Sequence, residues 1–231
     1  MRIPPEMGVR EAVDALLSRH KGDPSALHPF WTASRVSQQD RYERILVAAI
    51  ELGRAEGYDA MQMRNVAQRS GVALATVYTY FQSRDHLVHR ASAAWNSILT
   101  ETAAEHAYAR ASTEGEPSRF LAFVAELTRM FVAEPTMLEV WVRSTMTRDK
   151  LVVSAQTNID WMYWARTFDG ASVGADAEHH MLVIDDVFYA GAIRWAFGQA
   201  ELDDVVDRTL RVAERLLVGP ELEARALPEP A

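Results

Sequence analysis

The chain has 231 residues, of which 48% are hydrophobic, and it carries a formal net charge of −8 at pH 7. This length suits one large domain or two smaller ones, and the absence of cysteine excludes a disulfide framework and a thiolate metal site. No apolar run approaches the roughly 20 residues that a membrane-spanning helix needs, and the N-terminus lacks the apolar core of a signal peptide. These features predict a cytoplasmic protein without membrane partners.

The first 34 residues are predicted to form an N-terminal arm. Val9 to His20 has the spacing of a short helix, with Val13, Leu16 and Leu17 on one side. The polar run from Ser34 to Asp40 indicates a linker after it. A poorly ordered arm is favoured, and an arm folded against the C-terminal body of the chain is an alternative.

The clearest pattern in the chain follows this arm. Arg41 to Glu56 predicts a helix with apolar residues every three or four positions, which Gly57 ends. Met63 to Leu87 then predicts two short helices around Gly71, where a helix terminus needs a residue that tolerates positive φ. Ser83 is a favourable N-cap for a longer third helix. Together these elements form a helix-turn-helix, which places its second helix in the major groove of DNA.

The distribution of charge agrees with DNA binding by one end of the molecule. Residues 35–90 carry eight arginines and six acidic residues, a net charge of +2. Residues 91–231 carry 12 basic and 22 acidic residues, a net charge of −10. We call residues 35–90 the head and residues 91–231 the body. A positive head on an acidic body would be held to DNA by one end only, and we expect weak non-specific binding that depends steeply on salt.

Residue identities and spacings over Arg41 to Arg90 together resemble the signature of TetR-type transcriptional regulators. The residues that carry the resemblance are Arg64, Val66, Ala67, Gly71, Val72, Thr76, Tyr78, Tyr80, Phe81, Arg84 and Leu87. Two positions depart from the family pattern: Ala73 stands where Ser or Thr usually precedes the recognition helix, and Ala75 where Gly is common. Both departures change the surface offered to bases, so the operator cannot be copied from a relative.

The resemblance implies an all-α protein with an N-terminal three-helix helix-turn-helix DNA-binding domain at residues 35–90. A larger C-terminal helical domain for ligand binding and dimerisation would follow at 91–220, with a tail at 221–231. The stretch QMRNVAQRSGVALATVYTYF is most similar to a subgroup of actinobacterial regulators of cholesterol catabolism. This likeness implies a steroid or steroid-CoA metabolite as the hydrophobic effector, and a planar drug or an acyl-CoA metabolite is the alternative. For residues 1–34, contact with DNA is a further, less favoured alternative.

Seven residues of the predicted head are candidate DNA contacts. Positively charged and hydroxyl side chains suit phosphates, and an arginine also suits a guanine edge. Thr76 could also meet a thymine methyl group, whereas Leu74 and Ala75 could offer only apolar contacts. A surface ion pair is the alternative for Arg64 and internal packing for Tyr78, while Arg84 matches a backbone-binding lysine of the family. The seven residues are Arg64, Leu74, Ala75, Thr76, Tyr78, Tyr80 and Arg84.

The predicted body contains five of the six tryptophans. Apolar pockets with few polar groups suit flat hydrophobic ligands, and the family resemblance implies such a pocket. For each aromatic residue taken singly, a place in an ordinary core is the alternative. The candidate ligand-binding residues are Trp95, Phe123, Met130, Met137, Trp141, Trp161 and Phe188.

The last two predicted helices, residues 176–198 and 201–218, carry a wide apolar stripe. Paired copies would form a four-helix bundle across a two-fold axis, and a homodimer suits the half-site spacing of a helix-turn-helix. The alternative is that the stripe packs only within its own subunit. The candidate dimerisation residues are Trp195, Leu202, Val206, Leu210, Ala213 and Leu217.

We predict no catalytic residue, cofactor or metal site. His86 and His89 have a helical spacing that can chelate a metal, but no third ligand is evident and exposed histidines are favoured. The sequence has no Gly-rich phosphate loop, nucleophile elbow or HExxH motif. The alternative from another class is a helical small-molecule or lipid carrier without DNA binding. The favoured partners are a palindromic DNA operator, a hydrophobic effector and a second copy of the chain.

Overall fold

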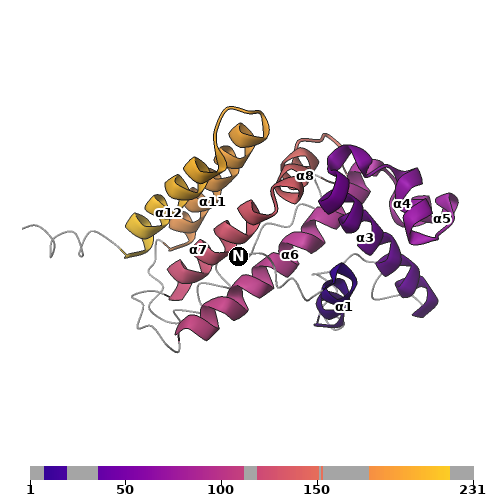
Figure 1. Ribbon diagram of the computed structural model, residues 1–231, viewed down its shortest axis with the longest axis horizontal. Coiled ribbons are helices and arrows are strands. Elements are labelled where there is room, and N and C mark those ends of the chain that lie inside the picture. Colours follow the sequence, from indigo (N-terminus) through magenta and orange to yellow (C-terminus); the bar gives the residue numbers. More distant parts are fainter. Residues whose placement is uncertain (1–7, 20–35, 112–118, 151, 153–176, 219–231) are drawn as a thin grey trace, which may run out of the picture. The chain divides into compact units, whose positions relative to one another are not determined.

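The computed structural model describes residues 8–19, 36–111, 119–150, 152 and 177–218 (Figure 1). Every regular element in these ranges is helical, which confirms the all-α prediction. None of the described helices is long and apolar enough to cross a membrane. In chain order the elements are α1 (Val9–Arg19), α3 (Val36–Glu56), the 3-10 turn η1 (Tyr58–Ala60), α4 (Met63–Ser70), α5 (Leu74–Tyr80), α6 (Arg84–Ala111), α7 (Arg119–Ala133), α8 (Pro135–Thr145), α11 (Ala177–Ala196) and α12 (Leu202–Val218).

The helices form two compact units. The first unit consists of Met1–Thr100 and Ala133–Thr157, and the second of Glu101–Val132 and Asn158–Ala231. Helix α6 contributes its first part to the first unit and its remainder to the second. Helix α8 therefore belongs to the same unit as the helices of the head.

Helix α3 is the centre of the first unit. It contacts α1, α4, α8 and η1. The predicted apolar face consists of Ile45, Leu46, Ala49 and Leu52, and all four are buried. Val47 and Ile50 are buried as well, because α1 and α8 pack on further sides of the helix. Gly53 permits a close approach, since a Cβ atom there would lie 2.9 Å from the sulfur atoms of both Met137 and Met61.

Helices α4 and α5 form the predicted helix-turn-helix. Gly71 ends α4 in the left-handed conformation, with φ of 65°, and its N–H is directed at the carbonyl of Ala67. Ala73 gives α5 no side-chain cap, as the sequence indicated. The ring of Phe81, which follows α5, stacks on Tyr42 of α3 with 5.4 Å between ring centroids. The supporting helix and the two short helices thus share one small core.

Helix α1 folds against α3. Its residues Val13, Leu16 and Leu17 are buried, on the side that the sequence predicted to be apolar. This helix is therefore ordered, and it packs on α3 of the head rather than on the body. The predicted linker lies partly outside the described residues, and its last part, from Val36, forms the first turns of α3.

The second unit contains α7, α11, α12 and the last part of α6. Helices α11 and α12 pack closely, because a Cβ atom at Gly191 would lie 2.8 Å from Cγ1 of Val205. A polar contact joins α6 to α7, with Nδ1 of His106 2.9 Å from Oε1 of Glu126.

Candidate nucleic-acid interface

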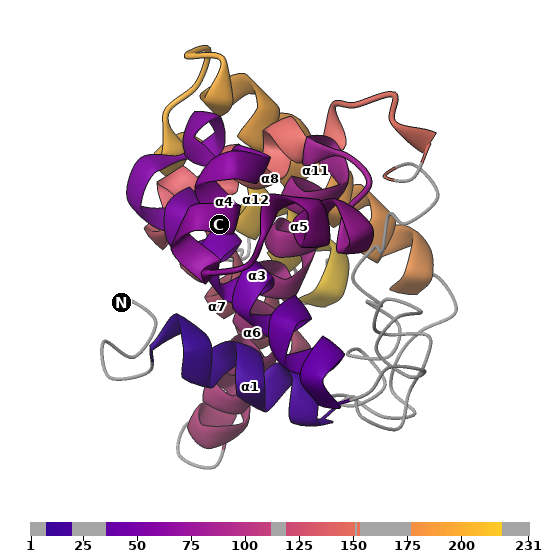
Figure 2. The same cartoon turned by 90° about the vertical axis from the view of Figure 1, so that its right-hand side faces the viewer.

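Helices α4 and α5, which lie towards the viewer in Figure 2, carry five of the seven predicted DNA contacts at exposed or half-buried positions. Tyr78 is 50% exposed and Leu74 is 36% exposed. We call the five residues the contact surface. They are Arg64 of α4, together with Leu74, Ala75, Thr76 and Tyr78 of α5.

Some arginines of the head form hydrogen bonds or ion pairs within the protein, and others do not. Arg44 donates to the carbonyl of Ser70, and Arg69 pairs with Glu51. Among the described residues, the exposed Arg41 and Arg64 form no hydrogen bond or ion pair. These two guanidinium groups are therefore available to a phosphate.

Sequence reasoning missed Arg41. It lies on α3 three residues after Gln38, whose carbonyl oxygen accepts a hydrogen bond from the hydroxyl of Tyr80 at the end of α5. This bond places the first turns of α3 beside α5. In the sequence Arg41 marked only the start of a helix, and nothing local indicated that the first turns of this helix would reach Tyr80 at the end of α5.

The structure corrects the assignment of Tyr80. Its side chain is only 5% exposed, and its hydroxyl donates to the carbonyl of Gln38 at 3.0 Å. Its ring lies edge-on to Tyr42, with 6.1 Å between centroids. Tyr80 lies three residues after the buried Val77, on the side of α5 that faces α3. It is an interior residue of the head and not part of the contact surface.

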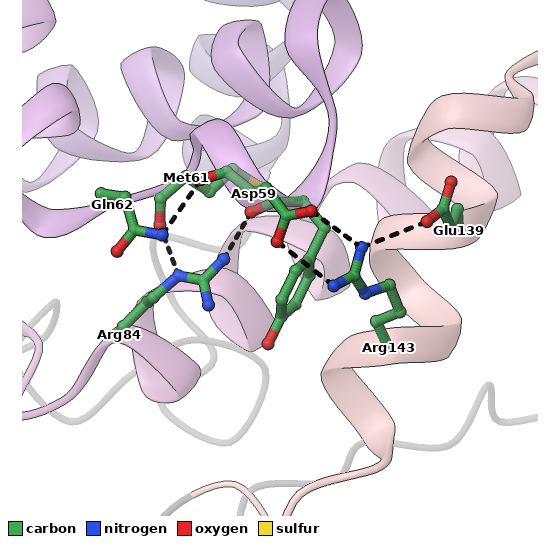
Figure 3. Close-up of polar contacts among 7 residues, drawn as sticks. Asp59, Met61, Gln62, Arg84, Glu139 and Arg143 are labelled. Atoms are coloured by element: carbon green, nitrogen blue, oxygen red, sulfur yellow. Dashed lines mark hydrogen bonds and ion pairs between the residues drawn. The ribbon is translucent and has the colours of Figure 1, made fainter.

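Arg84 is half-buried, and its guanidinium contacts the turn before α4 (Figure 3). Its Nη2 donates to the carbonyl of Tyr58 at 2.6 Å and its Nε donates to the carbonyl of Met61 at 3.2 Å. Its guanidinium carbon lies 4.2 Å from the centroid of the Tyr58 ring. These contacts join the start of α6 to the turn before α4. Two donors of the half-buried Arg84 are thus used within the head, and its contact with a DNA phosphate stays a prediction.

Arg143 of α8 contacts the same turn. Its guanidinium carbon lies 4.1 Å from the centroid of the Tyr58 ring, and its Nη2 is 3.2 Å from Oδ1 of Asp59 (Figure 3). Burial alone would lower the pKa of Arg143, but the hydrogen bonds and charges of Asp59 and Glu139 raise it above its usual value. The ring of Tyr58 thus interacts with one cation from α6 and one from α8.

Further contacts hold α8 and the residues after it to the head. Arg54 of α3 forms a two-fold hydrogen-bonded ion pair with Glu134, just before α8, at 2.7 and 3.0 Å. After α8, the hydroxyl of Thr147 donates to Oδ2 of Asp85 at 2.6 Å. Ser83, at the start of α6, donates to Asp149 at 2.5 Å. A change in the position of α8 would therefore act on the head at several points.

The predicted ligand-binding residues are divided between the two units. Trp95 is buried in the first unit, with the guanidinium of Arg54 4.7 Å from its ring centroid, and Met137 packs at Gly53. Trp141 on α8 is half-buried. Phe123, Met130 and Phe188 are buried in the second unit, and Trp161 lies outside the described residues. The role of these residues as a ligand-binding set remains a prediction.

The predicted dimerisation residues also separate. Ala213 is fully buried in the single chain, alongside Val205 and Thr209 on the side of α12 that packs within its own unit. This position corrects the assignment of Ala213 to an intersubunit surface. The others remain half-exposed and accessible to a second copy: Trp195, Leu202, Val206, Leu210 and Leu217.

His86 and His89 are buried rather than exposed, each 4% accessible. The ring of His86 lies 5.7 Å from that of Phe81, so α6 enters the core of the head at this point. Burial, followed by the charge of Arg90, lowers the pKa of His86. Within the described residues, no group of three His, Cys, Asp or Glu side chains is placed to hold a metal ion.

Comparisons with known proteins agree with this geometry. Residues 45–91 match the family model described as bacterial regulatory proteins, tetR family. The HTH-type transcriptional repressor KstR of Mycobacterium tuberculosis is 33% identical over 188 residues, which cover 79% of this chain and 83% of that protein. KstR of Rhodococcus jostii is 30% identical over 194 residues, covering 79% and 85%. A crystal structure of a TetR transcriptional regulator from Rhodococcus sp. RHA1 has the same fold, with a TM-score of 0.60 and 21% identity over 80% of this chain and 98% of that one.

Proposed function

This chain belongs to the TetR family of bacterial transcriptional regulators, and from that premise we propose that it is a cytoplasmic repressor that binds a palindromic operator as a homodimer. A hydrophobic small molecule, such as a steroid or acyl-CoA metabolite, releases it from DNA. The observation that carries the proposal is the contact surface: a helix-turn-helix with an exposed α5 and an unpaired Arg64 beside it.

Two copies are needed because one α5 helix reads few base pairs. Half-exposed apolar residues of α12, such as Leu202, Val206 and Leu210, offer a surface for the corresponding helix of a second copy. In a two-fold dimer the two α5 helices would be separated by about one turn of DNA or a multiple of it.

Release by an effector requires that the effector prefer a different arrangement of the helices around it. The operator affinity then falls only by the ratio of the effector affinities for the two arrangements. The ion pairs of Arg54 with Glu134 and of Arg143 with Asp59 link α8 to the head, and they support a route by which such a change reaches the head. The start of α6 at Ser83 belongs to the same set of contacts.

The first experiment is a mobility-shift titration of the purified full-length protein with DNA from its own upstream region, at two salt concentrations. We expect specific, salt-dependent binding by a dimer. Arg64→Ala should weaken binding and reduce the slope of log affinity against log salt by about two, one phosphate contact for each copy. Arg148→Ala, which removes an exposed arginine outside the contact surface, is the matched control.

The outcomes separate the two classes of function. An unchanged slope in Arg64→Ala would remove its phosphate role but leave the regulator intact. Absence of specific binding to any genomic fragment would instead favour the alternative of a helical small-molecule or lipid carrier.

A further inference from the structure

The exposed side of α5 presents no charged and no carboxamide side chain. The helix has the sequence LATVYTY, and its exposed positions are Leu74, Ala75, Tyr78 and Thr79. In the major groove, guanine is read in a bidentate manner by Arg or Lys, and adenine by Asn or Gln. Helix α5 has none of these residues, so it cannot read a purine in this way.

The groups that α5 does present are mainly apolar. Leu74 and Tyr78 are four residues apart and therefore lie next to each other on the helix. They are the exposed large hydrophobic residues of α5, at 36% and 50%. The hydroxyl of Thr79 donates to the carbonyl of Ala75 at 3.1 Å, so its hydrogen is used within the helix.

This apolar side is held in a defined orientation. On the opposite side of α5, Val77 is fully buried and Tyr80 is bonded to Gln38 of α3. The turn before α5 is held by Arg44, which donates to the carbonyls of Ser70 and Gly71. Leu74 therefore projects from a helix whose opposite side and preceding turn are both anchored in the head.

Taking the proposed operator-binding function as given, we propose that α5 selects its operator mainly through the 5-methyl groups of thymines, with Leu74 as the main contact. Thymine alone among the four bases places a methyl group in the major groove. Burial of that methyl group against Leu74 favours thymine over cytosine without any hydrogen bond. Arg64 and Arg41 supply attraction to the phosphates, which is the same for all sequences.

The test begins with selection of an operator by the full-length protein from a random DNA library. Each thymine of the selected site is then replaced by deoxyuridine, which pairs identically and lacks only the methyl group. We expect at least one thymine in each half-site whose replacement weakens binding about fourfold, the effect of about 0.8 kcal/mol for one buried methyl-sized group. Deoxyuridine placed in the flanking DNA is the control and should have no effect.

A second variant assigns the effect to a side chain. Leu74→Ala should weaken binding to the thymine operator and should lose the sensitivity to deoxyuridine, because the two changes remove the same contact. Leu182→Ala makes the same substitution at an exposed leucine of α11, 53% accessible, and should keep the full sensitivity.

Three results would count against the inference, and they differ in what else they refute. If no sequence is enriched by the selection, the operator-binding function fails and the inference fails with it. If a sequence is enriched but no deoxyuridine weakens binding, the function stands and methyl reading is wrong. If Leu74→Ala keeps the sensitivity, methyl reading by Leu74 is wrong.

Discussion

Replacing Arg54 by methionine tests how strongly α8 is held to the head. The substitution keeps much of the aliphatic packing but removes two hydrogen bonds to Glu134 and the cation over Trp95. The side chain of Glu134 is 15% exposed and that of Arg54 is 33% exposed. Breaking a fully buried ion pair from one side costs about 3–5 kcal/mol, whereas an exposed pair contributes less than about 1 kcal/mol. For this partly buried pair we expect a loss of about 2 kcal/mol in the free energy of unfolding.

The assay is urea denaturation followed by tryptophan fluorescence, with Arg54→Met, Glu134→Gln and the double variant measured together. Most of the loss in Arg54→Met comes from leaving the Glu134 carboxylate without its partner. The double variant should therefore be more stable than Arg54→Met, and it should lie within about 1 kcal/mol of the wild type. A double variant whose loss equals the sum of the two single losses would refute the reasoning, because the ion pair would then contribute nothing.

Two further predictions concern α3 and its neighbours. Burial, followed by a hydrogen bond and the charge of Asp14, raises the pKa of Glu43 from 4.5 to about 7, although Arg10 opposes this. The folded state favours the protonated carboxyl, so the free energy of unfolding should fall as pH rises from 4.5 through about 7. Denaturation at several pH values should show that Glu43→Gln lacks this part of the pH dependence. An identical slope of unfolding free energy against pH in both proteins would contradict the prediction. Tyr80→Phe should lower the free energy of unfolding by about 1 kcal/mol, because it removes the hydrogen bond to Gln38. The slope of log operator affinity against log salt concentration should stay unchanged, and a reduced slope would show that Tyr80 contacts DNA.

Local signals in the sequence determined the helix-turn-helix. Gly71 was identifiable because a left-handed helix terminus favours glycine over any other residue, and the structure has it at φ of 65°. Helical spacing sets which residues of α4 and α5 share a face, and the apolar Val66 and Val77 are both fully buried. These signals depend on a few neighbouring residues, so the chain alone was sufficient to predict the all-α class, α4, the turn and α5.

Only the tertiary structure decided which polar side chains of this scaffold face outward. Tyr80 and Arg84 have the chemistry of DNA contacts, yet their donors bond to the carbonyls of Gln38 and Tyr58, which lie 42 and 26 residues away in the chain. In the same way α8 lies against α3 and η1, although its residues come after α6 and α7. Helical spacing tells which residues of one helix share a face. What covers that face depends on helices from distant parts of the chain, and no local pattern contains that information.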